Sequence, residues 1–358
     1  MMKRHAFLVL LLITFSFISA QEVIENTEKP LNKDAGRILK LREELRITDE
    51  SGEFFFKYPS NLKVTSVGSI LLQDEEQLLK FSPEGKFLQN LYQKGQGPGE
   101  ISGEFEFDIS KDEIFIYDRT NIKFLCININ GDIVDELKIN QGRYRNFIGL
   151  IGDYLVVTEY KYPSLRNIKS GLYEMDYSVF LVSKDGLDEK DGYVFKVTIF
   201  LAKNGLMAWD YFDTHIDKDR NKIYVSYSRE YKIEVLDLNT YKISQTFRRK
   251  YPRVKYEFNY DYEGEFYKKF NPPEKKFKRD IFDLFLKNDL LWIKTSTKDK
   301  NKGVLYDAFN REGEYQDNFY FPVEGEVIGV HSDFIFVVER TKDETLNVVK
   351  YRVLENNS

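Results

Sequence analysis

This sequence of 358 residues contains few cysteines and histidines and has only a small net charge. The single cysteine, Cys126, excludes a disulfide framework, and its place in an alternating apolar run predicts a small core residue. Only three histidines are present, and no pattern typical of a zinc site arises. The formal net charge of -5 gives no basic field, which argues against nucleic acid as a partner. No later apolar run is long enough to predict a transmembrane segment in the mature chain.

The first twenty residues predict a secretory signal peptide. Lys3 and Arg4 supply the positive start, Phe7 to Ile18 form an apolar stretch, and Ser19-Ala20 provide small residues for cleavage. We therefore expect residues 1–20 to be removed and the protein to be exported, as a soluble monomer, to the periplasm or the extracellular space. No cysteine stands at the cleavage point, so the sequence does not predict a lipoprotein.

A short apolar strand pattern recurs six times in the rest of the chain. The copies begin at Ile70, Ile114, Tyr154, Ile223, Leu290 and Phe334. Each has another apolar stretch before it, and in the first five units a further strand, a tight turn and a last strand follow. Several turns contain pairs such as Asn130-Gly131 or Asp185-Gly186, which are typical of hairpins. We predict an all-β fold, a six-bladed β-propeller of four-stranded antiparallel blades over residues 37–358, after a linker at residues 21–36.

The last unit lacks a strand, because the chain ends soon after the stretch Leu346 to Val353. At the other end, Ile38 to Ile47 precedes the first complete blade and has no blade of its own. We predict that this N-terminal stretch, or its neighbour Glu53 to Tyr58, closes the ring, most simply with Ile38 to Ile47 as the outer strand of the last blade. A short amphipathic helix over Arg37 to Leu45 is the alternative that the pattern leaves open.

The stretch KGQGPGE, residues 94–100, follows the first blade and predicts a structural joint between two blades. Its members are Gly95, Gly97, Pro98, Gly99 and Glu100. We expect positive φ at Gly97 and Gly99, and we expect the Glu100 carboxylate to accept backbone hydrogen bonds.

The blades, the signal peptide and this joint together resemble the six-bladed β-propeller proteins exported by Gram-negative bacteria, which are related to NHL-repeat and TolB-like propellers. The resemblance covers about Ile38 to Val353, and its most specific residues are those of the joint. It implies the fold and an extracytoplasmic location, with no settled reaction. Many proteins of this kind have the sequence of lipoproteins, and this chain departs from them because it lacks the cysteine at the cleavage point.

The long connections are expected to share one face of the propeller. In an up-and-down blade, the links between blades and the turns between the second and third strands lie on the same side, where residues 93–104, 160–177, 202–208 and 250–280 fall. The insertion at residues 250–280 interleaves many Tyr and Phe with Lys and Glu. Such rings suit stacking on sugars or gripping a peptide. Rings that only pin a long loop onto the blades are the alternative.

We predict a ligand site on this face, beside the mouth of the central funnel. Its expected members are Arg143, Arg145, Asp210, Asp213, Tyr256, Tyr260, Tyr262 and Asp283. The predicted function is a binding or interaction module for a glycan, peptide or protein, without a cofactor. The alternative is a metal-dependent hydrolase or lyase acting on a carbohydrate or lactone, because pairs of carboxylates fall near the starts of four inner strands. Six-bladed lactonase-like enzymes hold a divalent cation in such a position, and calcium would serve here. No catalytic residue is assigned.

Overall fold

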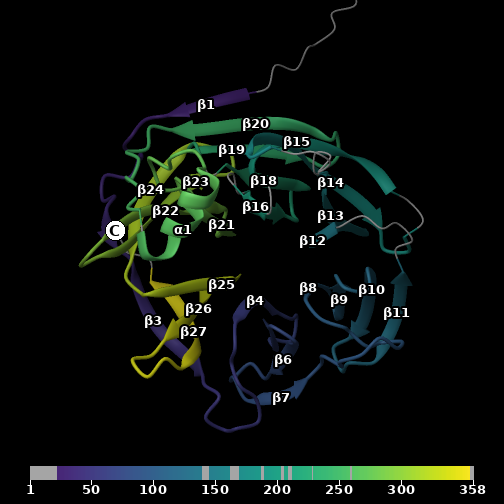
Figure 1. Ribbon diagram of the computed structural model, residues 1–358. Coiled ribbons are helices and arrows are strands. Elements are labelled where there is room, and N and C mark those ends of the chain that lie inside the picture. Colours follow the sequence, from purple (N-terminus) through teal and green to yellow (C-terminus); the bar gives the residue numbers. More distant parts are fainter. Residues whose placement is uncertain are drawn as a thin grey trace, which may run out of the picture.

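Six sheets built from four-stranded antiparallel blades surround a central axis, as Figure 1 shows. This computed structural model describes residues 22–138, 145–161, 169–186, 189–202, 205–208, 212–227, 229–258 and 260–354. The predicted six-bladed β-propeller is confirmed. The predicted signal peptide, residues 1–20, lies outside the described residues. Within the described ranges, no helix has the length and apolar character needed to cross a membrane.

Each blade runs from an inner strand at the axis to an outer strand at the rim. The inner strands are β4 (Pro59–Val64), β8 (Phe105–Ser110), β12 (Arg145–Ile151), β17 (Thr214–Asp217), β21 (Ile281–Lys287) and β25 (Gly325–His331). The second strands are β5 (Ile70–Asp74), β9 (Glu113–Asp118), β13 (Tyr154–Lys161), β18 (Lys222–Ser226), β22 (Leu290–Asp299) and β26 (Phe334–Arg340). The third strands are β6 (Gln77–Phe81), β10 (Lys123–Asn128), β14 (Gly171–Ser183), β19 (Lys232–Asp237), β23 (Gly303–Asn310) and β27 (Leu346–Leu354). The outer strands are β7 (Phe87–Asn90), β11 (Ile133–Lys138), β15 (Glu189–Ala202), β20 (Lys242–Arg249), β24 (Tyr315–Phe321) and β3 (Lys40–Ile47).

Six clusters of buried apolar side chains hold the described ring together, and each lies between two neighbouring blades. Leu72 and Phe81 of the first blade, for example, share a cluster with Ile328 and Phe336 of the last. The second strands are buried along most of their length because neighbouring blades cover both of their faces. The free thiol of Cys126 is buried in such a cluster, which confirms the predicted core position, and burial raises its pKa to about 11.

The N-terminal strand β3 closes the ring by pairing with β27 of the last blade. The two strands are antiparallel, and the register slips by one residue between Leu45 and Glu43. This bulge places Leu41 and Leu45, four residues apart, on opposite faces of the strand, because Leu41 packs toward the fifth blade and Leu45 toward the first. A four-residue spacing is also a helical spacing, so the alternative of a helix over Arg37 to Leu45 looked plausible, but it is wrong.

Three blades gain a fifth strand. The strand β1 (Glu22–Asn26) runs parallel to β20 at the rim of the fourth blade, and β2 (Arg37–Ile38) runs parallel to β24 in the fifth. The third blade adds β16 (Gly205–Ala208) beyond β15. Part of the segment expected to be a linker is therefore a strand. The strand β1 was not predicted, because it lies outside the repeated pattern of the blades.

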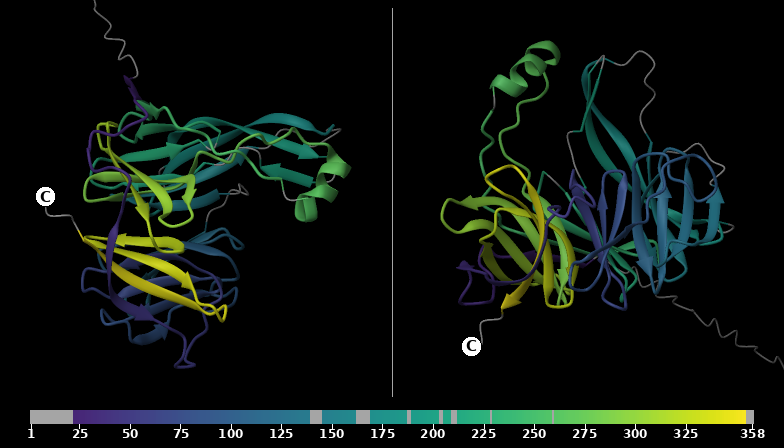
Figure 2. Two further views of the ribbon diagram at one scale, coloured as in Figure 1. Left: turned by 90° about the vertical axis from the view of Figure 1, so that its left-hand side faces the viewer. Right: turned by 90° about the horizontal axis from the view of Figure 1, so that it is seen from below.

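The long connections project from one face, as the right-hand view of Figure 2 shows for the single described helix α1 (Tyr260–Phe270) and the ends of β14 and β15. Much of the loop expected at residues 160–177 is in fact strand, because β13 and β14 continue to pair as far as Lys161 and Asp176. Apolar residues such as Met175 and Tyr177 alternate along this extension and pack against β15. The expected link at residues 202–208 likewise contains β16, and α1 was not predicted.

The joint at residues 94–100 is fastened to the second blade. The Glu100 carboxylate accepts the N–H of Gly97 at 2.8 Å, which agrees with its expected role. The N–H of Gly99 donates to the Glu136 carboxylate at 2.9 Å, and the buried Lys123 ammonium lies 2.9 Å from the same carboxylate. The ion pair of Lys123 and Glu136 therefore fixes the backbone of the joint through Gly99.

Only one of the two expected positive φ angles in this joint is present. Gly99 has φ of +75°, as predicted. Gly97 does not have a positive φ, so that prediction is wrong. Glycine is favoured at Gly97 and Gly95 by close approach instead: a Cβ would lie 3.1 Å from Oε2 of Glu100 at Gly97 and 1.9 Å from it at Gly95.

Candidate ligand-binding site

The central channel is crossed by an ion pair toward the face opposite the insertion. Asp108 of β8 lies 2.7 Å from the Lys218 ammonium, which follows β17 of the fourth blade, and 3.6 Å from that of Lys63. Burial alone would raise the pKa of Asp108, but Lys63, Lys218 and the Leu150 N–H hold it below its usual value. A ligand is therefore expected to approach from the insertion face.

Two carboxyl groups from neighbouring blades face the insertion end of the channel. Burial raises the pKa of Asp213, just before β17, to about 6, against the opposing effect of Arg279. Burial also raises the pKa of Asp283, on β21, to about 6, and the charges of Asp213 and Glu326 add to that rise. Asp283 is therefore close enough to Asp213 and Glu326 to feel their charges, and the pKa values of both Asp213 and Asp283 lie well above those of ordinary aspartates.

A third raised carboxyl group lies on the second blade. Burial raises the pKa of Glu106 to about 7, and the Arg119 guanidinium opposes the rise. One carboxylate oxygen of Glu106 is buried without a hydrogen-bond partner. Among the described residues, no three His, Cys, Asp or Glu side chains form a group that could hold a metal ion.

The insertion at residues 250–280 is built as two antiparallel limbs that carry α1 at their tip. Lys255 and Phe277 pair as an isolated bridge, and the N–H of Tyr256 donates to the Lys276 carbonyl at 3.1 Å. The N–H of Lys278 donates to the Val254 carbonyl at 2.9 Å. These bonds fix which side chains of the returning limb stand together.

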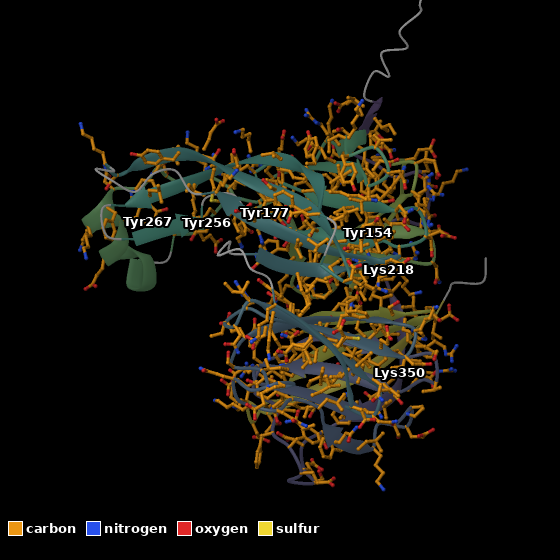
Figure 3. All side chains as sticks on the ribbon, turned by 90° about the vertical axis from the view of Figure 1, so that its right-hand side faces the viewer. Tyr154, Tyr177, Lys218, Tyr256, Tyr267 and Lys350 are labelled. Atoms are coloured by element: carbon orange, nitrogen blue, oxygen red, sulfur yellow. The ribbon has the colours of Figure 1, made fainter. Side chains whose placement is uncertain are left out.

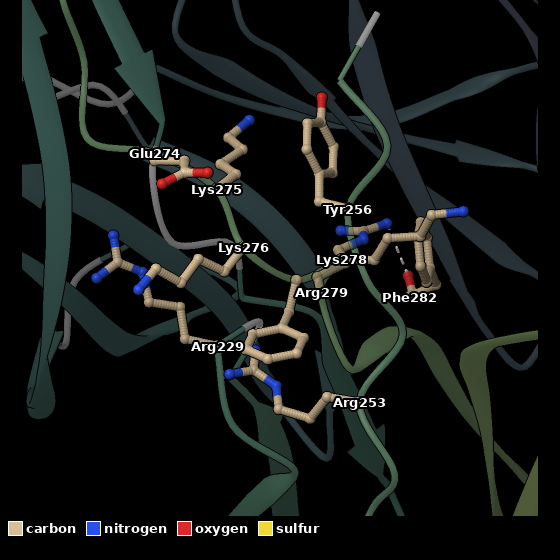
Figure 4. A pocket seen from close by; sticks show the side chains of 10 residues that line it. Arg229, Arg253, Tyr256, Glu274, Lys275, Lys276, Lys278, Arg279 and Phe282 are labelled. Carbon is tan, nitrogen blue, oxygen red and sulfur yellow. Dashed lines mark hydrogen bonds between the residues drawn. The ribbon is translucent and has the colours of Figure 1, made fainter.

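A cavity of about 710 Å³ lies at the base of this arm. Figure 4 shows the side chains that line it: Arg229, Arg253, Tyr256, Glu274, Lys275, Lys276, Phe277, Lys278, Arg279 and Phe282. We call it the insertion pocket. Six of the lining side chains are basic and one is acidic, in a protein whose net charge is -5. The positive charge is therefore a local property of the pocket.

Arg279 connects the insertion pocket to the channel carboxylates. Its guanidinium lies 3.8 Å from the Asp213 carboxylate and donates to the Phe282 carbonyl at 3.1 Å, the bond dashed in Figure 4. The same guanidinium lies 4.3 Å from the centre of the Phe282 ring. Arg253 is held in a similar way, 2.9 Å from the Asp280 carboxylate and 4.7 Å from the Phe277 ring centre. Two of the cations are thus fixed in position before any ligand binds.

A second cavity, of about 610 Å³, lies between the first and second blades on the same face. It is lined by Lys57, Tyr58, Ser60, Gln73, Glu75, Glu76, Glu104, Phe105, Glu106 and Arg119. Four of these side chains are acidic and two are basic. Positive and negative potential are therefore separated across the channel mouth, with the insertion pocket as the positive side.

The structure brings together some of the residues predicted to bind a ligand. Asp213 and Asp283 interact electrostatically, and Tyr256 lines the insertion pocket. In Figure 3, Tyr256 and Tyr267 lie on the projecting part of the molecule. Arg145 begins β12, and Tyr260 and Tyr262 belong to α1. Arg143 and Asp210 lie outside the described residues. The ligand-binding role of the whole set stays a prediction.

None of the six basic side chains of the insertion pocket was predicted from the sequence as a site residue. The run Lys275-Lys276-Phe277-Lys278-Arg279 was the available signal, since four basic residues out of five are unusual in an acidic chain. The aromatic residues before and within α1 form the more conspicuous pattern of the insertion.

The fold and the site define a six-bladed β-propeller with long connections on one face. Residues 47–192 match the family model DUF5128, described as a 6-bladed beta-propeller. The predicted resemblance to six-bladed β-propeller proteins is thereby confirmed. No curated protein matches the sequence.

Solved structures with the same architecture come from several bacteria. A protein from Bacteroides fragilis classed as exported has a TM-score of 0.53 at 14% identity, over 93% of this chain and 100% of that one. A member of the DUF4221 family from Bacteroides vulgatus has a TM-score of 0.53 at 11% identity, over 89% and 99%. A gluconolactonase from Xanthomonas campestris has a TM-score of 0.50 at 11% identity, over 90% and 96%. At these identities the likeness shows the fold.

Proposed function

We propose that this protein is an exported, extracytoplasmic binding module that holds a glycan, peptide or protein partner on the insertion face. The observation that carries the proposal is the insertion pocket, where rings and charged side chains meet in a cavity of about 710 Å³. Cavities of this size on rigid scaffolds are typical of ligand sites. The likeness to a protein classed as exported and the predicted signal peptide support the location.

The test compares two double variants on arrays of immobilised glycans and peptides. Tyr256→Ala with Lys278→Gln alters the insertion pocket, whereas Tyr58→Ala with Lys57→Gln makes the same chemical changes at the acidic cavity of the same face. We expect the first pair to lose at least about tenfold in apparent affinity and the second to keep the wild-type signal. Equal behaviour of the two pairs, or a wild-type protein that binds nothing on the arrays, would refute the proposal.

A metal-dependent hydrolase or lyase acting on a carbohydrate or lactone is the second candidate. The observation that favours it is the set of carboxyl groups with raised pKa at the channel mouth, Asp213, Asp283 and Glu106. The fold is shared with a gluconolactonase. If this candidate is right, purified protein dialysed against metal-free buffer should retain about one calcium or other divalent ion per chain, measured by atomic emission. A metal content near zero, together with array binding that persists in a chelator, would favour the binding module.

A further inference from the structure

The insertion pocket contains two lysines whose positive charges are not paired within the described part of the chain. Arg253 and Arg279 have carboxylate partners, Asp280 and Asp213, but the ammonium groups of Lys276 and Lys278 make no ion pair or hydrogen bond within the described ranges. Like charges that share a pocket repel one another, and an anion that enters lowers that electrostatic free energy. The cavity is therefore built to favour a ligand with more than one negative group.

Flat apolar surfaces stand next to these cations. Tyr256, Phe277 and Phe282 line the pocket, and the Phe277 ring is 41% exposed. The Lys275 ammonium lies 5.6 Å from the Tyr256 ring centre, so the tyrosine also carries a cation at its face. The C–H faces of sugar rings stack on such surfaces while carboxylate or sulfate groups reach the surrounding cations.

Resting on the proposed binding function, we infer that the insertion pocket recognises an acidic oligosaccharide, one whose sugar rings carry carboxylate or sulfate groups. The acidic cavity across the channel mouth repels such a ligand and directs it to the insertion pocket.

A peptide bound by strand addition is less suited to this site. Strand addition requires unpaired backbone groups, whereas the backbone groups of Tyr256, Lys276, Lys278 and Val254 already bond one limb of the insertion to the other. The groups that line the pocket are mainly side-chain donors and rings, which match a polyanionic sugar better than a peptide backbone.

The experiment measures binding of four probes to the mature chain by isothermal titration calorimetry. The probes are trigalacturonate, its fully methyl-esterified form, a sulfated galactose disaccharide and a triglutamate peptide. The methyl ester keeps the sugar rings and removes the charge. We expect trigalacturonate or the sulfated disaccharide to bind at least about tenfold more tightly than the methyl ester and the peptide. The affinity of the acidic sugar should fall as added salt screens the charges of the pocket. The stronger of the two acidic sugars identifies carboxylate or sulfate as the preferred group.

Matched variants tie the binding to the pocket. The double variant Lys276→Gln with Lys278→Gln should bind the acidic sugar at least about tenfold more weakly than the wild type. The control, Lys255→Gln with Lys268→Gln, makes an equal charge change at exposed positions of the same arm and should leave binding unchanged. Binding of the methyl ester as tight as that of trigalacturonate overturns the inference and leaves the proposed function standing, and so does preferential binding of triglutamate. If none of the four probes binds, the inference is overturned, and the arrays described above decide separately whether the proposed function survives.

Discussion

Replacement of Asp307 by Asn should destabilise the propeller, because this side chain is a fully buried charge that joins two blades. Asp307 of β23 is 0% exposed and accepts hydrogen bonds from Arg249 at 2.8 Å and 3.1 Å. The hydroxyls of Tyr231 and Tyr315 donate to it at 2.5 Å and 2.6 Å. Arg249 ends β20 in the fourth blade, next to the start of the insertion, so the cluster ties the fourth blade to the fifth.

The expected loss follows from the charge that the substitution leaves unpaired. Removal of one partner from a buried ion pair costs about 3–5 kcal/mol, because the other charge stays buried without compensation. In Asp307→Asn, that charge is the Arg249 guanidinium, which is 3% exposed. Loss of a single hydrogen bond to a charged group costs about 1.5–3 kcal/mol, so Tyr315→Phe should have a smaller effect. For a chain of this size, a loss of about 4 kcal/mol corresponds to a fall in Tm of about 6 °C.

The assay is urea denaturation followed by tryptophan fluorescence, with thermal melting as a second readout. Arg249→Met alone, Asp307→Leu alone and the two together complete a double-mutant cycle. The double variant should be more stable than the sum of the single losses allows, because neither charge is then stranded. An Asp307→Asn protein within about 1 kcal/mol of the wild type, or a strictly additive cycle, would refute this reasoning.

Three further predictions concern closure, the joint and the channel carboxylates. Deletion of residues 21–48 leaves the edge of β27 unpaired, so the protein should aggregate or melt well below the wild type, whereas deletion of residues 22–26 should cost much less; equal melting would contradict the closure. Gly99→Val should lower the free energy of unfolding, measured by urea denaturation, by more than about 1–2 kcal/mol, because the backbone of Gly99 has φ of +75°. Gly97→Val should lower it less, and the reverse order would disprove the argument. Burial raises the Asp283 pKa to about 6, above its unfolded value, so the stability that the protonated group contributes is lost as pH rises through about 6. The urea midpoint of Asp283→Asn should therefore improve relative to the wild type between about pH 4 and 7, and a difference that is independent of pH would exclude this origin.

The sequence predicts the blades well because their signal is local. Each second strand is apolar on both faces, and in the first five blades the third strand is followed by a hairpin turn, so patterns of a few residues mark them. The closure by β3 was also predictable, because the last unit visibly lacked a strand. The short strands β1 and β2 were not, because they pair in parallel with segments more than 220 residues away in the sequence and carry no turn of their own.

The site was less predictable because it depends on which segments meet in space. The proximity of Asp213 to Asp283 could be anticipated, because each lies near the start of an inner strand. The grouping of Arg229 with Lys278 could not, because it depends on how the limbs of the insertion fold back over the fourth blade. The buried cluster of Arg249 and Asp307 was equally hidden, since its four polar members come from different strands and loops.

Closure by β3 and β27 makes completion of the ring depend on the order of synthesis. Of the ring's strands β3 leaves the ribosome first and β27 last, so the two can pair only after all the other blades have been made. A product that stops before Leu346 keeps the edges of both β3 and β26 open, and open edges invite aggregation and proteolysis. Pairing of β3 with β27 therefore distinguishes complete chains from truncated ones, because only chains that contain both strands have no open edge at this blade.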